Sequence, residues 1–256
     1  MLPWSQSAIE CAGSFTQGER GGRMPVEGRV SALNRGTTAE EVATLLRETI
    51  MDGRLKPGEQ LREEGLSAQF DVSRRTIRDA LGILARERIV RHYRHKGSRV
   101  VLFTEEDIRD LYRVRTTLEG SAAARAATLT DAQLRQLSEA FDRLAEATDS
   151  GQAQAIVQRD LEFHQAVVGL IGSTRVDDFF AGIAVEMRFA LSILETTYQE
   201  STHRPAEALA EHRAILEAFL HRDTPEAARL VQEHADSNER LLVEVVASTD
   251  ITALAR

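Results

Sequence analysis

Residues Val72 to Leu84 carry the sequence pattern that most narrows what this chain can fold into. Ser73 is a residue type that caps a helix by accepting a hydrogen bond from an early backbone N–H, and Val72 with Ile77 can form the hydrophobic staple that sets the entry angle. Ile77, Leu81 and Leu84 then recur at i, i+4 and i+7, which places them on one apolar stripe. The other sides of the first turns carry Arg74, Arg75, Thr76 and Arg78.

A helix with one apolar face and a basic N-terminal end has the form of a DNA recognition helix. In such a helix the N-terminal residues meet base edges and phosphates in the major groove, while the apolar side packs on a supporting helix. The alternative is an ordinary helix that begins with a solvated basic turn. Its neighbours in the sequence distinguish the two.

Charge is distributed unevenly along the chain. The net charge is −8, which taken whole argues against a nucleic-acid partner. Residues 74–99, however, contain nine Lys or Arg against two acidic residues, whereas residues 104–256 contain 15 basic and 27 acidic residues. Because charge acts locally, this distribution indicates two domains with two tasks: a basic one that meets a polyanion and an acidic one that does something else.

Composition favours a mostly helical protein in the cytoplasm. Hydrophobic residues make up 42% of the 256 residues and aromatic residues only 5%, a balance typical of helices rather than sheets. No apolar run approaches the roughly 18 to 20 residues needed to span a bilayer, and the N-terminus lacks the order of a signal peptide. The single Cys11 excludes a disulfide framework. Residues 1–36 show no sustained period and are expected to form a flexible leader, with Met1 or Met24 as the start.

The residues around Val72–Leu84 predict a winged helix-turn-helix domain over residues 37–103. A capping-box pattern at Thr38 and Glu41 precedes a helix over 39–51, a Pro-Gly turn follows, and a short helix is expected over about 63–69. After the recognition helix, two short β-prone runs at 89–93 and 98–102 flank a basic turn. A basic hairpin beside a helix-turn-helix is a wing.

Six further helices can be predicted from Thr104 onward, and they define a second domain over residues 104–256. Their expected ranges are 105–127, 131–148, 152–172, 175–198, 205–221 and 225–247. The connections are short, so neighbouring helices should pack antiparallel in a bundle.

Four polar side chains fall on the inward faces of these helices. His164 shares an apolar stripe with its neighbours, and Asp160 borders that stripe one turn earlier; His212 and His234 lie on the apolar faces of two other helices. A single inward histidine is most often a satisfied core residue. Four such groups together favour a divalent metal site, because imidazole nitrogens and a carboxylate suit zinc first, with nickel or manganese as alternatives.

Arg115 also falls on an apolar stripe, with Glu119 one turn later. An inward guanidinium can pair with the carboxylate of a small ligand, which makes Arg115 and Glu119 candidate effector-binding residues. A buried Arg115–Glu119 ion pair is the equally good alternative.

At this point the first half of the chain resembles the N-terminal domain of the GntR family of bacterial transcription regulators. The resemblance rests on Ile50, Gly53, Lys56-Pro57-Gly58, Leu61, Glu63 and Leu66, then on Val72-Ser73-Arg74, Arg78, Ala80-Leu81 and Leu84, and finally on Gly97 and Val100. It implies that Arg74, Arg75, Thr76 and Arg78 touch a double-stranded operator and that His95, Lys96 and Gly97 of the wing reach the backbone or minor groove. Arg88 departs from the family, which usually has a glycine there, so the recognition helix is expected to end less sharply.

The second half resembles the FCD ligand-binding domain of the FadR branch of the same regulators. The residues that carry this resemblance are Arg115, Leu118-Glu119, Asp160, Phe163-His164, Glu211-His212, Ile215, Ala218, Asp223, Ala227 and His234. It implies a metal-assisted pocket for a small carboxylate, such as a sugar acid or a dicarboxylate.

Together the two halves predict a ligand-controlled transcription regulator, and we expect a repressor that the effector releases from DNA. One recognition helix covers only a half-site, so a homodimer is expected, and no membrane partner. The alternative from another class is a metal-dependent enzyme that acts on a small organic acid and carries a tethered basic domain. That alternative lacks a placed general base or any Ser/His/Asp or Cys/His arrangement.

Overall fold

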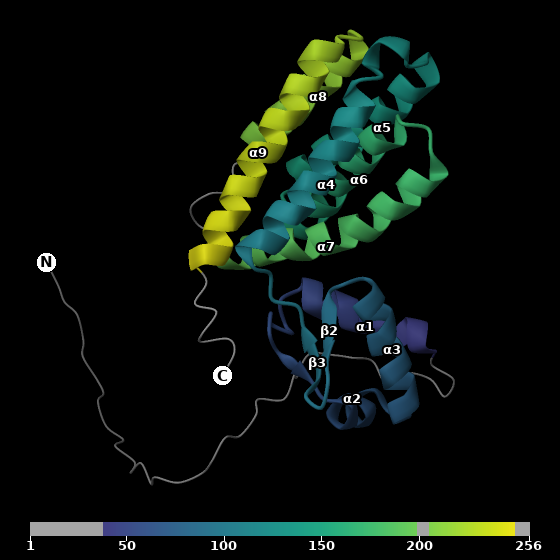
Figure 1. Ribbon diagram of the computed structural model, residues 1–256, viewed down its shortest axis with the longest axis vertical. Coiled ribbons are helices and arrows are strands. Elements are labelled where there is room, and N and C mark those ends of the chain that lie inside the picture. Colours follow the sequence, from purple (N-terminus) through teal and green to yellow (C-terminus); the bar gives the residue numbers. More distant parts are fainter. Residues whose placement is uncertain (1–37, 199–204, 249–256) are drawn as a thin grey trace, which may run out of the picture.

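Two groups of elements follow one another in the computed structural model, which describes residues 38–198 and 205–248. The first group consists of α1 (Ala39–Met51), β1 (Gln60–Leu61), α2 (Glu63–Phe70), α3 (Arg74–Arg86), β2 (Val90–Tyr93) and β3 (Gly97–Val100). The second consists of α4 (Glu105–Ala123), the 3₁₀ turn η1 (Ala126–Thr128), α5 (Asp131–Ser150), α6 (Ala153–Gly169), α7 (Thr174–Tyr198), α8 (Pro205–Leu220) and α9 (Thr224–Ser248). Figure 1 shows the second group as a bundle above the first. The predicted leader lies outside the described residues.

The first group forms a winged helix-turn-helix, as predicted. Thr38 and Glu41 make the capping box at the start of α1, and the side chain of Ser73 accepts a hydrogen bond from the backbone N–H of Thr76 at the start of α3. The sheet has the order β1-β3-β2 with antiparallel pairing, and Tyr93 pairs with Gly97 across the hairpin. The strand β1 was not predicted, because two residues are too few to show an alternating pattern.

The recognition helix α3 ends sharply, contrary to expectation. It stops at Arg86, and Arg88 adopts a left-handed conformation with a φ of 57°. Backbone hydrogen bonds from Arg88 to Ala85 and from Ile89 to Leu84 close the end of the helix. A non-glycine residue tolerates this conformation at a cost of about 1 kcal/mol, so the missing glycine leaves the helix end in place.

The second group is an antiparallel helical bundle, as predicted. Thr104 and Thr130 form capping boxes at the starts of α4 and α5. The first helix is shorter than expected, because its last predicted turn is the separate 3₁₀ turn η1, after which Leu129 turns extended and is buried. Helix α9 lies along α4 and α8, and α6 packs between α5 and α7.

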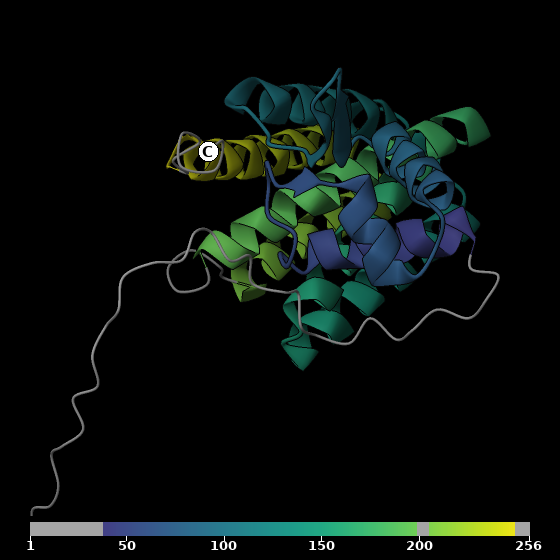
Figure 2. The same cartoon turned by 90° about the horizontal axis from the view of Figure 1, so that it is seen from below.

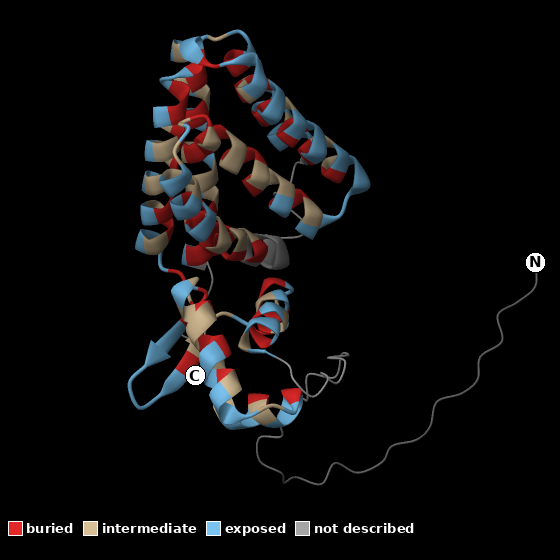
Figure 3. Cartoon of the chain, turned by 90° about the vertical axis from the view of Figure 1, so that its right-hand side faces the viewer, coloured by how far each residue is buried: buried red, intermediate tan, exposed pale blue. Residues whose placement is uncertain are grey.

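Helix α7 lies at the end of the bundle that faces the winged domain (Figures 1 and 2). One continuous apolar core joins the two parts here, and the rings of Phe103 and Phe189 lie 5.5 Å apart within it. Arg88, just after α3, forms an ion pair with Glu186 of α7 at 3.5 Å. Figure 3 shows buried residues along the facing sides of the helices and exposed ones outside. Among residues 38–198 and 205–248, no helix is both long and apolar enough to cross a membrane.

Candidate functional site

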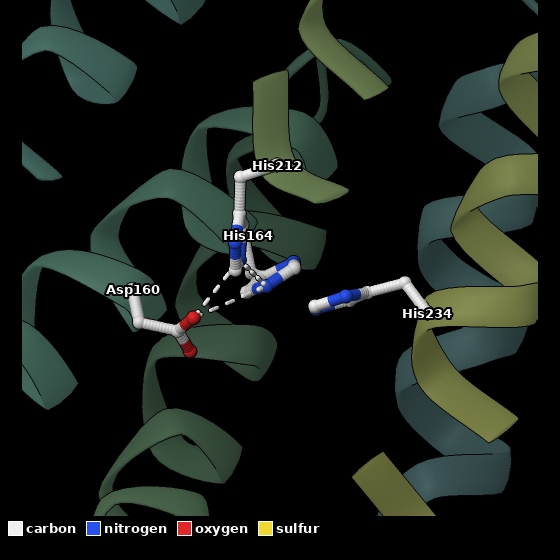
Figure 4. A group of neighbouring side chains, drawn as sticks. All are labelled: Asp160, His164, His212 and His234. Atoms are coloured by element: carbon white, nitrogen blue, oxygen red, sulfur yellow. Dashed lines mark hydrogen bonds and ion pairs between the residues drawn. The ribbon is translucent and has the colours of Figure 1, made fainter. Parts of the chain in front are cut away.

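The four predicted metal ligands converge inside the bundle. Asp160 and His164 come from α6, His212 from α8 and His234 from α9, and one ligand atom of each lies within 4.8 Å of the others. The three histidines are buried, and Asp160 is partly exposed. In Figure 4 the imidazoles of His164 and His212 lie beside the carboxylate of Asp160, and His234 points toward them from the opposite side.

Each histidine has an oxygen acceptor at Nδ1. Glu119 of α4 lies 3.1 Å from Nδ1 of His164, and Glu211 of α8 lies 2.8 Å from Nδ1 of His234. Nδ1 of His212 lies 2.6 Å from the backbone carbonyl of Ala208. Carboxylates and carbonyls only accept hydrogen bonds, which assigns a proton to Nδ1 of His212 and to Nδ1 of His234. Nδ1 of His164 also lies 2.9 Å from the guanidinium of Arg115, which only donates. In metal sites, a hydrogen bond from the ring nitrogen that does not bind the ion to a carboxylate or carbonyl fixes the tautomer of the histidine.

The imidazole rings and the carboxylate of Asp160 lie close to one another. Nε2 of His164 and Nε2 of His212 lie 3.0 Å apart, and Nε2 of His212 lies 2.9 Å from a carboxylate oxygen of Asp160. The guanidinium of Arg115 approaches Nε2 of His164 to 2.5 Å, and the side-chain amide of Asn238 approaches Nε2 of His234 to 3.0 Å. The donor set therefore fits a divalent cation: one ring nitrogen of each histidine and one carboxylate oxygen of Asp160 converge.

Electrostatics of the surrounding groups also suit a cation. Burial alone would raise the pKa of Asp160, but His212, His164 and Arg115 hold it well below its ordinary value. Burial would likewise raise the pKa of Glu119, but the charges of Arg115 and His164 outweigh this effect and lower the pKa to about 2. Both carboxyl groups are ionised at neutral pH. Together with Glu211 they outnumber the single guanidinium of Arg115 by two charges, which a divalent ion balances.

Two of the imidazoles are held neutral, the form that binds metal ions. Burial lowers the pKa of His164, and the charge of Arg115 lowers it further. Burial, with His212 next in size, lowers the pKa of His234 to about 3. At neutral pH neither side chain has to lose a proton before it can coordinate a cation.

Arg115 forms the ion pair with Glu119 and also lines a cavity. Its Nε donates to Glu119 at 2.8 Å, and the pair is buried, so the predicted ion pair exists. Arg115 also lines a cavity of about 400 Å³ that reaches His212, His234 and Asp160. The hydroxyl of Tyr112, which lines the same cavity, is buried and finds no hydrogen-bond partner among the described residues. The cavity walls thus offer a cation and an unused hydroxyl to an anionic ligand beside the histidine cluster.

The predicted DNA contacts lie on the surface of the winged domain, far along the chain from the histidine cluster. Arg74, Arg75 and Arg78 are exposed at the start of α3, and Thr76 is half-buried with its hydroxyl 2.9 Å from that of Ser73. His95, Lys96 and Gly97 are exposed at the turn between β2 and β3. That turn and α2 lie on the side of the winged domain that faces away from the bundle (Figure 1).

Sequence reasoning missed the residues that support the cluster from outside. Glu211 and Asn238 both contact His234, and Tyr112 lines the cavity, yet none of the three was predicted as a site residue. A weak signal existed for two of them. Glu211 adjoins His212 in the chain, and Asn238 follows His234 by four residues, the spacing that places two side chains on one helix face.

Comparison with known families matches both halves of the chain. The profile described as "Bacterial regulatory proteins, gntR family" matches residues 38–100, and the profile described as "FCD domain" matches residues 110–237. The first match covers the winged helix-turn-helix and the second covers the bundle with all four cluster residues.

Individual relatives and a solved structure agree with the family match. The gluconate operon transcriptional repressor of Bacillus licheniformis is 29% identical over 193 residues, which cover 75% of this chain and 79% of the relative. The probable D-xylose utilization operon transcriptional repressor of Paenarthrobacter nicotinovorans is 28% identical over 204 residues, which cover 79% of this chain and 85% of the relative. A putative GntR regulator from Rhodococcus sp. RHA1 superposes with a TM-score of 0.68 at 28% identity, covering 82% of this chain and 98% of that one.

These matches are to transcription regulators and not to enzymes, which counts against the metal-dependent enzyme considered above. The chain belongs to the GntR family of bacterial transcription regulators, in the branch that carries a C-terminal FCD domain.

Proposed function

We propose that this protein is a DNA-binding transcriptional repressor controlled by a small carboxylate effector, which binds at a metal-containing pocket in the helical domain. The observation that carries the proposal is the cluster of Asp160, His164, His212 and His234, of which all but His164 line the same cavity as Arg115. The names of the relatives support repression, since two of them are repressors of sugar or sugar-acid operons.

The metal we propose is a divalent ion, zinc in the first place and nickel or manganese as alternatives. Asp160, His164, His212 and His234 would hold it. When bound, such an ion supplies Lewis-acid attraction for an anionic oxygen in the cavity. Arg115, held by Glu119, adds a second cationic contact on the same wall, and Tyr112 offers a hydroxyl. This combination favours a carboxylate, and the relative named for gluconate supports a sugar acid among the carboxylates.

For DNA binding we propose contacts from Arg74, Arg75, Thr76 and Arg78 of α3, with His95, Lys96 and Gly97 from the wing. Their exposure on the side away from the bundle supports this assignment. One such domain covers one half-site, so we propose a homodimer on a near-palindromic operator. Effector binding in the bundle would then change how the two winged domains are spaced.

The DNA part is tested with a duplex selected by the wild-type protein from a random-sequence library. Arg74→Ala or Arg78→Ala should weaken binding to that duplex at fixed salt, by about 1 to 3 kcal/mol for a lost base contact. Arg175→Ala, which removes an exposed arginine of the bundle, is the matched control. Equal binding by all three variants would contradict the proposed DNA contacts.

The effector part is tested by metal analysis of the purified protein and by a thermal-shift screen. Gluconate, other sugar acids and dicarboxylates are compared with D-xylose, which has no carboxylate. A carboxylate should stabilise the metal-loaded protein, release the selected duplex, and do neither after chelation. Absence of a bound divalent ion in protein purified without chelators, and after reloading, would contradict the metal pocket.

A further inference from the structure

Two of the three arginines at the start of α3 are held by carboxylates of α2. Arg78 donates from Nε to Glu63 at 3.2 Å and from its NH2 nitrogen at 2.8 Å. The guanidinium of Arg74 contacts Glu64 at 2.6 Å. The third arginine, Arg75, only approaches Asp79 of its own helix at 3.9 Å.

The packing of α2 on α3 places these carboxylates. Leu66 and Phe70 of α2 and Ile77 and Leu81 of α3 are buried in the same core. The hydroxyl of Ser67 also donates to the backbone carbonyl of Val72, at 2.6 Å, across the turn between the two helices. The start of α2 therefore stays beside the start of α3, so that Glu63 and Glu64 face the arginines.

The contact between Glu63 and Arg78 leaves the useful end of the guanidinium free. It occupies Nε and one hydrogen of the NH2 nitrogen, a side-on pair. Both hydrogens of the NH1 nitrogen and the second hydrogen of the NH2 nitrogen remain. That end is the one that donates two parallel hydrogen bonds to O6 and N7 of guanine. Arg78 can thus bind a guanine while Glu63 still holds its plane.

Stability does not explain these pairs. The side chain of Arg78 is 68% exposed and that of Glu63 is 28% exposed; those of Arg74 and Glu64 are 63% and 80% exposed. Exposed pairs of this kind add little to folding. Carboxylates next to a DNA-binding surface repel phosphates and weaken binding to any sequence. The two glutamates also lie outside residues 74–99, so they offset part of the local positive charge counted from the sequence.

We propose that Glu63 is a positioning residue for base recognition by Arg78, and that Glu64 restrains Arg74 from binding phosphates indiscriminately. Together they raise the preference of the protein for its operator over other DNA. Glu63 acts by fixing the guanidinium plane, and Glu64 acts by competing for Arg74. This inference rests on the proposed DNA contacts of α3.

The test compares Glu63→Gln, Glu64→Gln and Asp79→Asn, each of which removes one negative charge near α3. Binding is measured for the duplex selected by the wild-type protein and for a scrambled duplex of equal length and composition, over a range of salt concentrations. Glu63→Gln should lower the ratio of selected to scrambled affinity about tenfold, since the bidentate pair is lost. Glu64→Gln should raise affinity for the scrambled duplex and steepen its salt dependence by about one phosphate contact. Asp79→Asn should leave the ratio near the wild-type value.

A double-mutant cycle separates positioning from a merely structural role. In an Arg78→Lys background, which cannot form the bidentate contact, Glu63→Gln should no longer change the ratio. The inference is overturned if Glu63→Gln leaves the ratio unchanged in the wild-type background, or lowers it equally in the Arg78→Lys background. If the wild-type protein itself prefers no duplex, the proposed function fails instead, so the two failures are distinguishable. Thermal unfolding of each variant shows whether the fold is retained.

Discussion

Truncation of Glu211 is expected to weaken metal binding without loosening the fold. Glu211 accepts a hydrogen bond from Nδ1 of His234 at 2.8 Å and is not itself one of the four converging ligands. Its side chain is 50% exposed, so Glu211→Ala leaves no buried charge without a partner. What the variant loses is the acceptor that orients the ring of His234 and keeps the proton on Nδ1.

The size of the effect follows from the role of such acceptors. Loss of a hydrogen bond that orients a metal-binding histidine lowers metal affinity about 10- to 100-fold, or about 1.4 to 2.7 kcal/mol. At an ion concentration 1,000 times the wild-type dissociation constant, the ion stabilises the wild-type fold by about 4.1 kcal/mol and the variant by only about 1.4 to 2.7 kcal/mol. For a chain of this size the metal-induced rise in Tm should therefore be smaller by roughly 3 to 11 °C.

The assay is a thermal unfolding series over zinc, nickel and manganese concentrations, paired with a competition titration against a chelator. Glu217→Ala is the matched control, because Glu217 is an exposed glutamate of the same helix and lies six residues after Glu211. His234→Ala, which removes a ligand, marks the full loss. The reasoning is refuted if Glu211→Ala holds the ion as tightly as Glu217→Ala does.

Three other perturbations test the buried charges and the contact between the domains. Glu119→Gln leaves the guanidinium of Arg115 buried without its counter-ion, so denaturant unfolding should show a loss of about 3 to 5 kcal/mol, whereas Glu226→Gln at an exposed pair should change little. Folding lowers the pKa of His234 from 6.5 to about 3, so between pH 6.5 and pH 3 the unfolded chain binds more protons than the folded one. The Tm measured in the presence of a chelator should therefore fall as the pH decreases below about 6.5. His234→Gln should make this fall smaller. Burial raises the pKa of Glu186 above its ordinary 4.5, so ionisation of Glu186 lowers the stability of the fold as the pH rises. The Tm of Glu186→Gln should match that of the wild type below pH 4.5 and be slightly higher at pH 7. A lower Tm of the variant at pH 7 would contradict this.

Periodicity accounts for the parts that were predicted from the sequence. The 3.6-residue repeat placed His164 on the apolar stripe of its helix and Asp160 at the border, and the structure has them buried and partly exposed, respectively. Capping residues such as Thr38 and Ser73 fixed the helix starts to the residue. These are local rules, and each needs only a few neighbouring residues to apply.

The contacts that were not predicted depend on how two helices cross. Glu119 meets His164 only because α4 crosses α6, and Glu63 meets Arg78 only because α2 packs on α3 at one angle. The spacing of polar residues identifies which side of each helix is polar. It does not identify which residues of one helix lie beside which residues of another. Arg88 illustrates the other limit: its left-handed backbone is imposed by the hydrogen bonds that end α3 and not by its own preference.

Helix α7 connects the cavity beside the histidine cluster with the turn that follows the recognition helix α3. Leu191 of α7 lines the cavity beside the histidine cluster, and Glu186, five residues earlier on the same helix, contacts Arg88 at the end of α3. A helix transmits a rotation or shift along its length because its backbone hydrogen bonds resist bending. A ligand that changes the position of Leu191 therefore acts on a rigid segment that also contacts Arg88, two residues after the end of the recognition helix. Since Arg88 is held in a left-handed conformation at this contact, a shift of α7 bears directly on the turn that follows α3.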